Sequence, residues 1–235
     1  MPARAAFVNP LRLDRPHSAL RRHGVAGLAV VALAFGLCTG SLRAAPPSEA
    51  GAFIDDLVSK ALKTLADKGK DDQARGAQFR QLLDDDFDMP RISRFVLGRY
   101  WNDASDQDKQ QFQKLFEDYV VRSYAARFGE YSGETVKITN SRAESETSTL
   151  VQSQIIRANG APPAKVDWRV RKNGTGFKIV DVDVEGVSMV LTQREEFSSV
   201  IQRSGGSLAG LNRELQQKLA SGDNSLAAPP LPKKE

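Results

Sequence analysis

The sequence predicts an α+β fold in which helices flank an antiparallel sheet of four strands or slightly more. Three observations support this fold class. Apolar residues recur at three- and four-residue spacing between residues 53 and 129, which is the helical period. From residue 134 to 185 apolar and polar residues alternate, as they do in half-buried strands. The helical period returns at Met189, so helices flank one continuous run of strands.

The first 44 residues have the features of a secretory signal peptide. Arginines precede an apolar run, Gly24 to Leu37, that is too short to span a bilayer, which needs about 20 residues. Small residues follow this run, and we expect cleavage after Ala44. A short membrane anchor is the alternative interpretation. Cleavage leaves a single domain over residues 45–220.

Removing this leader changes the charge and the chemistry of the chain. The whole chain has a formal net charge of +4, and the leader contributes six Arg and one Asp, so residues 45–235 are close to neutral. A nucleic-acid partner is therefore not expected. Cys38, His17 and His23 also lie in the leader, and the rest of the chain has no thiol or imidazole. Ser-His catalysis, a Cys nucleophile and the usual zinc sites are excluded there. Catalysis by carboxylates alone and oxygen-ligand metal sites remain open. We expect no cofactor and no metal.

The helical period predicts four helices before the sheet, over residues 53–69, 73–84, 92–97 and 105–129. The last is the longest, and Ser105 is its expected N-cap. Between the second and third helices, Asp84–Asp86 are expected to form a solvated turn. Asp88 should then cap the third helix, with Pro90 in its first turn. Gly98 is expected to end that helix.

Four strands are expected over residues 135–139, 149–157, 165–171 and 177–185. Asn173-Gly174 is a strong hairpin signal between the last two, so the strands should form an antiparallel meander. On the third strand, Val166, Trp168 and Val170 share one phase and are expected to point inward. On the fourth, the apolar phase changes after Ile179, which indicates a bulge or apolar groups on both faces.

Two further helices are expected after the sheet. The first covers residues 189–201 and ends at Gly205-Gly206, and the second covers residues 208–219. Residues 221–235 contain three prolines and a charged end, and we expect a disordered C-terminal tail there.

Three segments, taken in order, resemble a known family. They are Phe95-Val-Leu-Gly-Arg-Tyr-Trp with the helix that follows, Pro162-Pro163 with Val166-Asp-Trp-Arg-Val-Arg-Lys-Asn-Gly, and Glu185-Gly-Val-Ser-Met with the helices after it. This pattern resembles the periplasmic lipid-binding component of the Mla (maintenance of lipid asymmetry) system, also called the toluene-tolerance family. The likeness covers roughly residues 51–220. Its most specific step is the one from Glu185 to Met189.

The resemblance implies a curved sheet and helices that enclose a deep apolar cavity for phospholipid tails. Two acyl chains would need a cavity near or above the top of the usual ligand range, about 1,000 Å³. It implies a periplasmic carrier that catalyses no reaction. Its implied partners are phospholipid, an outer-membrane lipoprotein complex and an inner-membrane ABC transporter complex. From the matched helix and strands, the candidate lining residues are Phe95, Tyr119, Leu150, Trp168, Val184, Val187 and Met189.

Three alternatives stay open. In the first, the cargo is hopanoid or another lipid, because a related group is associated with hopanoid synthesis. In the second, the chain is a periplasmic hydrolase that uses carboxylates such as Asp181 and Asp183. In the third, the chain is an interaction domain with a solid core, because periodicity shows which side chains point inward and not whether the interior is hollow.

Several charged residues also have two interpretations. Arg91, Arg94 and Arg99 either contact a lipid phosphate or pair with the acidic cluster of residues 84–88, and the pairing is favoured. A second basic group (Arg169, Arg171 and Lys172) is expected to form an exposed strip on one strand, either solvated or docking an acidic partner. Glu185 is expected to be a structural cap rather than a catalytic acid.

Overall fold

The computed structural model describes residues 48–67, 69, 71–125 and 131–222, so the expected leader and residues 223–235 lie outside the described residues. The helices are α1 (Glu49–Ala66), α2 (Asp72–Asp86), α3 (Met89–Leu97), α4 (Tyr100–Asp103), α5 (Asp106–Ala125), α6 (Met189–Arg203) and α7 (Leu208–Ser221). The strands are β1 (Thr135–Ala143), β2 (Ser148–Ile156), β3 (Ala164–Asn173), β4 (Gly176–Val184) and β5 (Val187–Ser188). Within this part of the chain, no helix combines the length and the apolar content needed to cross a membrane.

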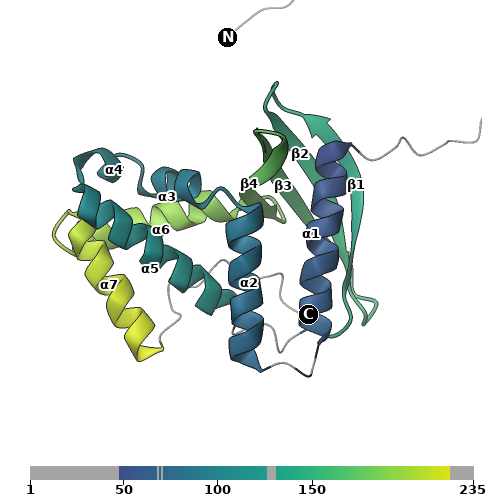
Figure 1. The fold of residues 1–235 in the computed structure, drawn as a ribbon, viewed down its shortest axis with the longest axis horizontal. Coiled ribbons are helices and arrows are strands. Elements are labelled where there is room, and N and C mark those ends of the chain that lie inside the picture. The colour runs from purple at the N-terminus through teal and green to yellow at the C-terminus, as the bar shows by residue number, and fades with distance from the viewer. Residues whose placement is uncertain (1–47, 68, 70, 126–130, 223–235) are drawn as a thin grey trace, which may run out of the picture. The chain divides into compact units, whose positions relative to one another are not determined.

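The strands pair in chain order, β1-β2-β3-β4-β5, and every pair is antiparallel (Figure 1). Helices α1 and α2 come before the sheet in the chain and pack beside it, and α6 and α7 come after it in the chain. The predicted α+β fold and antiparallel meander are therefore confirmed. The short β5 adds a fifth strand, which pairs with β4 and leads directly into α6.

The phase change predicted on the last long strand is a β-bulge. Val170 of β3 pairs with Ile179, whereas the preceding Arg169 pairs with Asp181, so Val180 is the extra residue on β4. A bulge increases the local twist of the sheet and changes which face the following side chains occupy. Ile179 therefore packs in the core beside α1, and Val182 and Val184 face the cavity described below.

The six expected helices are present, and the structure differs from the sequence-based expectations in three places. Asp84–Asp86 belong to the last turn of α2 and not to a turn between helices. Acidic side chains disfavour a helix C-terminus, but Lys178 of β4 donates through Nζ to the carbonyl oxygens of Asp84 (2.9 Å) and Asp85 (2.6 Å). The four-residue helix α4 was not expected. Strand β1 extends to Ala143 because its pairing with β2 continues past a register shift.

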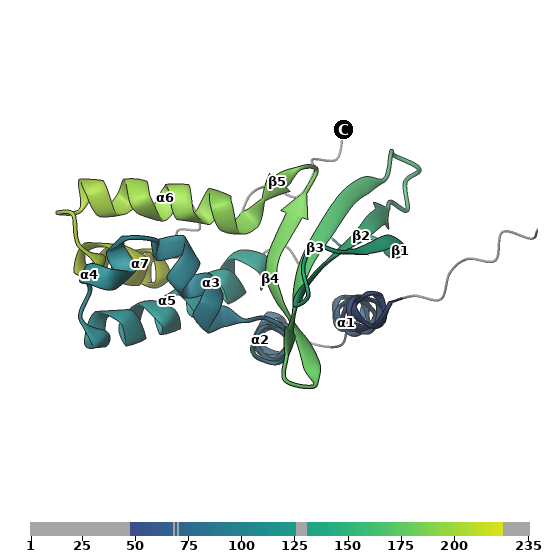
Figure 2. The ribbon, with the colours of Figure 1, turned by 90° about the horizontal axis from the view of Figure 1, so that it is seen from above.

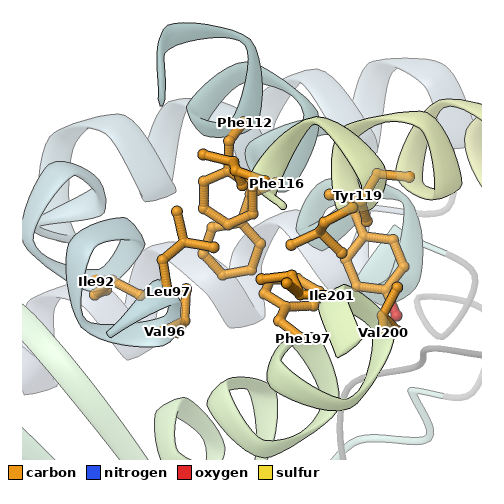
Figure 3. Packing of buried hydrophobic residues seen from close by; sticks show 12 residues of the cluster. Ile92, Val96, Leu97, Phe112, Phe116, Tyr119, Phe197, Val200 and Ile201 are labelled. Carbon is orange, nitrogen blue, oxygen red and sulfur yellow. The ribbon is translucent and has the colours of Figure 1, made fainter. Parts of the chain in front are cut away.

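The apolar side chains form two cores. One lies among helices α3, α5, α6 and α7, and its centre is Phe197, whose ring lies 5.4–6.5 Å from the rings of Phe112, Phe116 and Tyr119 (Figure 3). The other lies between α1 and the sheet, where Ile54 contacts a cluster that includes Val151 and Ile179. Helix α2 lies between α1 and α5 and contacts both (Figures 1 and 2). Two separate cores leave room for a cavity at their junction.

Two buried helical glycines give opposite predictions for the same substitution. A Cβ on Gly210 would lie 2.1 Å from the carbonyl oxygen of Ser204, whereas a Cβ on Gly76 would meet Val121 Cγ1 at an ordinary 3.9 Å. We expect Gly210→Ala to lower the free energy of unfolding by about 1–3 kcal/mol through overpacking against backbone. Gly76→Ala should raise it by about 0.4–1 kcal/mol, because alanine restricts the unfolded chain. Urea unfolding of both variants measures the difference, and equal effects would contradict the close approach of α7 to Ser204.

Candidate functional site

A cavity of about 310 Å³ lies between the sheet and helices α1, α2, α3, α5 and α6. Its walls are mostly aliphatic and aromatic. Its lining includes residues that were not predicted from the sequence: Val58, Leu62, Phe79, Leu83, Ile92, Val96, Phe116, Val120, Val136, Ile155, Val166, Val182 and Val190. Many of them belong to apolar stripes that are visible in the sequence. Such a stripe shows that a side chain points inward, but not whether it packs against other side chains or faces a cavity. An apolar hollow of this kind binds apolar groups.

The cavity is smaller than expected for two acyl chains. Its volume is at the low end of the usual range for ligand sites, which is about 300–1,000 Å³. The expected volume near or above about 1,000 Å³ is therefore wrong for this structure. The physical reason is that Phe87 packs against both cores and lines the cavity, so its side chain occupies part of the space between them. Its backbone also bridges to Ile179 of β4, which ties the junction of α2 and α3 to the sheet.

Four of the seven candidate residues line this cavity, and three do not. Tyr119, Trp168, Val184 and Met189 are among the lining residues. Phe95 lies on the outer side of α3 with 42% of its surface exposed, and its ring is 5.1 Å from the Arg194 guanidinium. Val187 is 48% exposed on β5.

Leu150 is buried but lies outside the cavity. It pairs with Arg169 of β3 and Arg142 of β1, one residue out of phase with Val151, which packs in the core between α1 and the sheet. Side chains alternate between the two faces of a strand, so Leu150 points to the face opposite Val151. A one-residue error in phase is enough to misplace a side chain in this way.

The orientation of Trp168 is held by hydrogen bonds at the edge of its ring. Its Nε1 donates to Ser153 Oγ at 2.9 Å, and that hydroxyl donates in turn to the carbonyl oxygen of Val166 at 2.9 Å. The polar group of the indole is thus satisfied within the sheet, and its apolar surface is left to line the cavity. Trp168 therefore presents a fixed apolar wall rather than a polar contact.

Asp181 also lines the cavity, and its carboxylate is fully engaged. Its Oδ2 accepts from Ser188 Oγ at 2.7 Å and from Arg169 at 3.1 Å, and its Oδ1 accepts from the backbone N–H of Val190 at 3.3 Å. Ser188 is itself the N-cap of α6 and accepts from the N–H of Leu191. The carboxylate therefore fixes the start of α6 beside the sheet.

The basic strip expected on β3 is not a row of free charges. Arg169 bridges Asp181 and Glu144, which accepts from Arg169 Nε at 2.9 Å. This hydrogen bond lowers the pKa of Glu144 below its ordinary value. Arg171 and Lys172 continue the strand, and Lys172 is exposed.

Two further carboxylates, Asp183 of β4 and Glu185 of the turn that follows it, are not among the residues lining the cavity. Burial raises the pKa of Asp183, and the facing Asp167 raises it further. Glu185 is a structural cap, as expected: its Oε1 accepts from the backbone N–H of Lys165 at 2.6 Å, and it adopts φ 53° in the turn between β4 and β5. No group of three or more potential metal-ligating side chains occurs among the residues that the structure describes.

Two of the three arginines near α3, Arg91 and Arg99, have partners close to them in the chain. Arg91 pairs with Asp88 at 3.3 Å, which confirms the favoured pairing for that residue, and Asp88 also caps α3 as expected. Arg99 donates to the hydroxyl of Tyr100 at 3.0 Å.

A family model described as "MlaC protein" matches residues 53–217 of the chain. The chain is 26% identical over 113 residues to the intermembrane phospholipid transport system binding protein MlaC of Haemophilus influenzae, covering 47% of this chain and 53% of that protein. It is 24% identical over 143 residues to the toluene tolerance protein ttg2D of Pseudomonas putida, covering 59% of this chain and 66% of that protein. The chain thus spans about half the length of the first relative and just under two thirds of the second.

The fold is also similar to a solved structure. This is the phospholipid-binding protein of Ralstonia solanacearum in complex with a phospholipid, with a TM-score of 0.65 and 27% sequence identity. The match covers 74% of this chain and 98% of that chain. The similarity therefore extends over nearly all of the solved protein.

Proposed function

Because the chain belongs to the MlaC protein family, we propose that it is a lipid carrier that holds phospholipid acyl chains in the cavity between its sheet and its helices. The observation that carries this proposal is the apolar cavity itself, lined from five helices and from strands of the sheet. An interaction domain with a solid core would have no such cavity. The phospholipid bound by the solved relative supports phospholipid as the cargo, and hopanoid or another lipid is the alternative.

The energetics favour a carrier that encloses the acyl chains. Two chains of about 16 carbons would remove about 30 methylenes from water, which is worth on the order of 20–25 kcal/mol at about 0.8 kcal/mol each. Escape of such a lipid into water is correspondingly slow, so transfer needs a protein that shields the tails. A cavity of about 310 Å³ must widen to hold both chains. Displacement of Phe87, which packs against both cores, is the simplest way to widen it.

We further propose that the chain works in the periplasm, exported by its N-terminal 44 residues. There it would carry lipid between an outer-membrane lipoprotein complex and an inner-membrane ABC transporter complex. The name of the Haemophilus influenzae relative, an intermembrane phospholipid transport system binding protein, supports this role. The test is transfer between vesicles: purified protein should move labelled phospholipid from donor to acceptor vesicles at a rate proportional to protein concentration. No transfer by a protein that does bind lipid would restrict the role to binding.

The carrier is proposed to catalyse no reaction, which can be separated from the hydrolase alternative by substitution. Asp183 has a raised pKa, the property expected of a catalytic acid, but does not line the cavity. We expect Asp183→Asn to bind as much phospholipid as the wild type, and neither protein to release fatty acid from it. Thin-layer or mass-spectrometric assay of free fatty acid measures both. Fatty acid release by the wild type that Asp183→Asn abolishes would establish the hydrolase.

A further inference from the structure

Two polar side chains are buried in the apolar wall of the cavity. Ser123 of α5 is 4% exposed and Gln193 of α6 is 8% exposed, and both line the cavity. The Ser123 Oγ and Gln193 Nε2 atoms have no hydrogen-bond partner among the described residues. Buried polar groups are nearly always paired, because burying an unpaired donor costs the free energy of its lost hydration. The pair therefore requires an explanation that packing does not supply.

Ser123 and Gln193 each lie one helical turn from an aromatic residue, and these two aromatic rings contact each other. The rings of Tyr119 and Phe197 lie 6.5 Å apart and join α5 to α6 (Figure 3). Ser123 follows Tyr119 by four residues and Gln193 precedes Phe197 by four, so each lies on the same helix face as its ring. Helix α6 starts at the sheet and runs away from it, so Gln193 lies nearer the sheet than Phe197 does (Figure 2).

Asp181, a charged residue of the same wall, differs from this pair. Asp181 accepts three hydrogen bonds from within the chain and has no need of a ligand. It also accepts and does not donate when ionised. The amide of Gln193 and the hydroxyl of Ser123 instead carry N–H and O–H donors that no described residue accepts.

We propose that Gln193 and Ser123 form a polar subsite that donates hydrogen bonds to the acyl ester carbonyl oxygens of the bound lipid. This inference rests on the proposed carrier function. Of the groups that join the tails of a diacyl phospholipid to its headgroup, the ester carbonyls are the acceptors that can enter an apolar cavity with the tails. Ether-linked lipids and hydrocarbon lipids lack these carbonyls. The subsite therefore selects ester-linked acyl lipids over lipids with equally apolar tails.

The test is a competition between two lipids that differ only in the linkage. The full chain is incubated with vesicles of equal parts diester and diether phosphatidylglycerol with identical chain lengths, purified again, and its bound lipid is quantified by mass spectrometry. We expect the wild type to bind the diester lipid in about 5- to 10-fold excess over the diether lipid, the effect of one or two hydrogen bonds in an apolar site. Gln193→Met and Ser123→Ala should each reduce this ratio, and the double variant should bring it close to one. Gln202→Met is the matched control on the exposed side of α6, and it should keep the wild-type ratio.

The outcomes separate this inference from the carrier function. A wild type that binds one lipid per chain but takes both lipids equally would overturn the subsite and leave the carrier function standing. A wild-type preference that both Gln193→Met and Ser123→Ala retain would also overturn it. A wild type that takes up neither lipid would overturn the carrier function, and the subsite with it. The wild-type ratio requires no variant to fold, so the inference stays testable if a substitution destabilises the domain.

Discussion

Trp168→Asp is expected to reduce bound phospholipid at least tenfold. Trp168 lines the cavity with its indole, whose Nε1 is already satisfied by Ser153. An aspartate at this position would put an ionised carboxylate where acyl chains are proposed to lie, and burying such a charge costs several kcal/mol. Each 1.4 kcal/mol lowers affinity about tenfold. The measurement is phospholipid per mole of protein after purification without detergent.

Two further variants control for this substitution. Trp168→Phe keeps an aromatic wall and loses only the hydrogen bond to Ser153, so it should keep most of its lipid. Val120→Glu introduces a carboxylate into the same cavity from α5, without altering a strand of the sheet, and should also lose lipid. Circular dichroism shows which variants are folded. A folded Trp168→Asp that holds as much lipid as the wild type would refute the placement of Trp168 against the acyl chains.

Phe197→Ala is expected to give the largest loss of stability in the domain. Phe197 is fully buried, and its ring packs against the rings of Phe112, Phe116 and Tyr119 of α5 (Figure 3). Removing a ring from such a site costs about 3–5 kcal/mol, the sum of lost transfer free energy and the cavity left behind. Total stabilities are about 5–15 kcal/mol, so this loss would take a large share. Urea unfolding followed by circular dichroism measures it.

Phe95→Ala is the matched control for that prediction. It removes the same side chain from the exposed side of α3, where the ring contacts Arg194 and remains 42% exposed. The expected loss is below about 1 kcal/mol, the range of an exposed cation–π contact. Similar losses for the two variants would contradict the central position of Phe197 in the helical core.

The fold was predictable because its signals are local. The periods of three to four and of two place the helices and strands. The phase change after Ile179 predicted a bulge or apolar groups on both faces, and the structure has a bulge there. The prediction of a turn at Asp84–Asp86 was wrong. Helix α2 continues there because Lys178, nearly 100 residues away in the chain, donates hydrogen bonds to the carbonyl oxygens at its end. A contact between distant segments of this kind leaves no local signal in the sequence.

The cavity was less predictable than the fold. Periodicity indicates that Tyr119 and Trp168 point inward, and it cannot say that Leu150, also buried, lies on the other face of the sheet. The volume depends on how closely two cores approach at Phe87, which is a property of tertiary packing. Gln193 had no signal at all, because a polar residue within an amphipathic helix is normally exposed. Its burial becomes visible only when α5 and α6 are placed together.

The most direct test of the account is extraction of the purified protein. The full chain is expressed in a Gram-negative host, recovered from the periplasm without detergent, extracted with organic solvent and analysed by mass spectrometry. We expect close to one phospholipid per protein, with ester-linked acyl chains. A protein recovered without lipid, which also takes none from phospholipid vesicles, would contradict the assignment of the cavity to acyl chains.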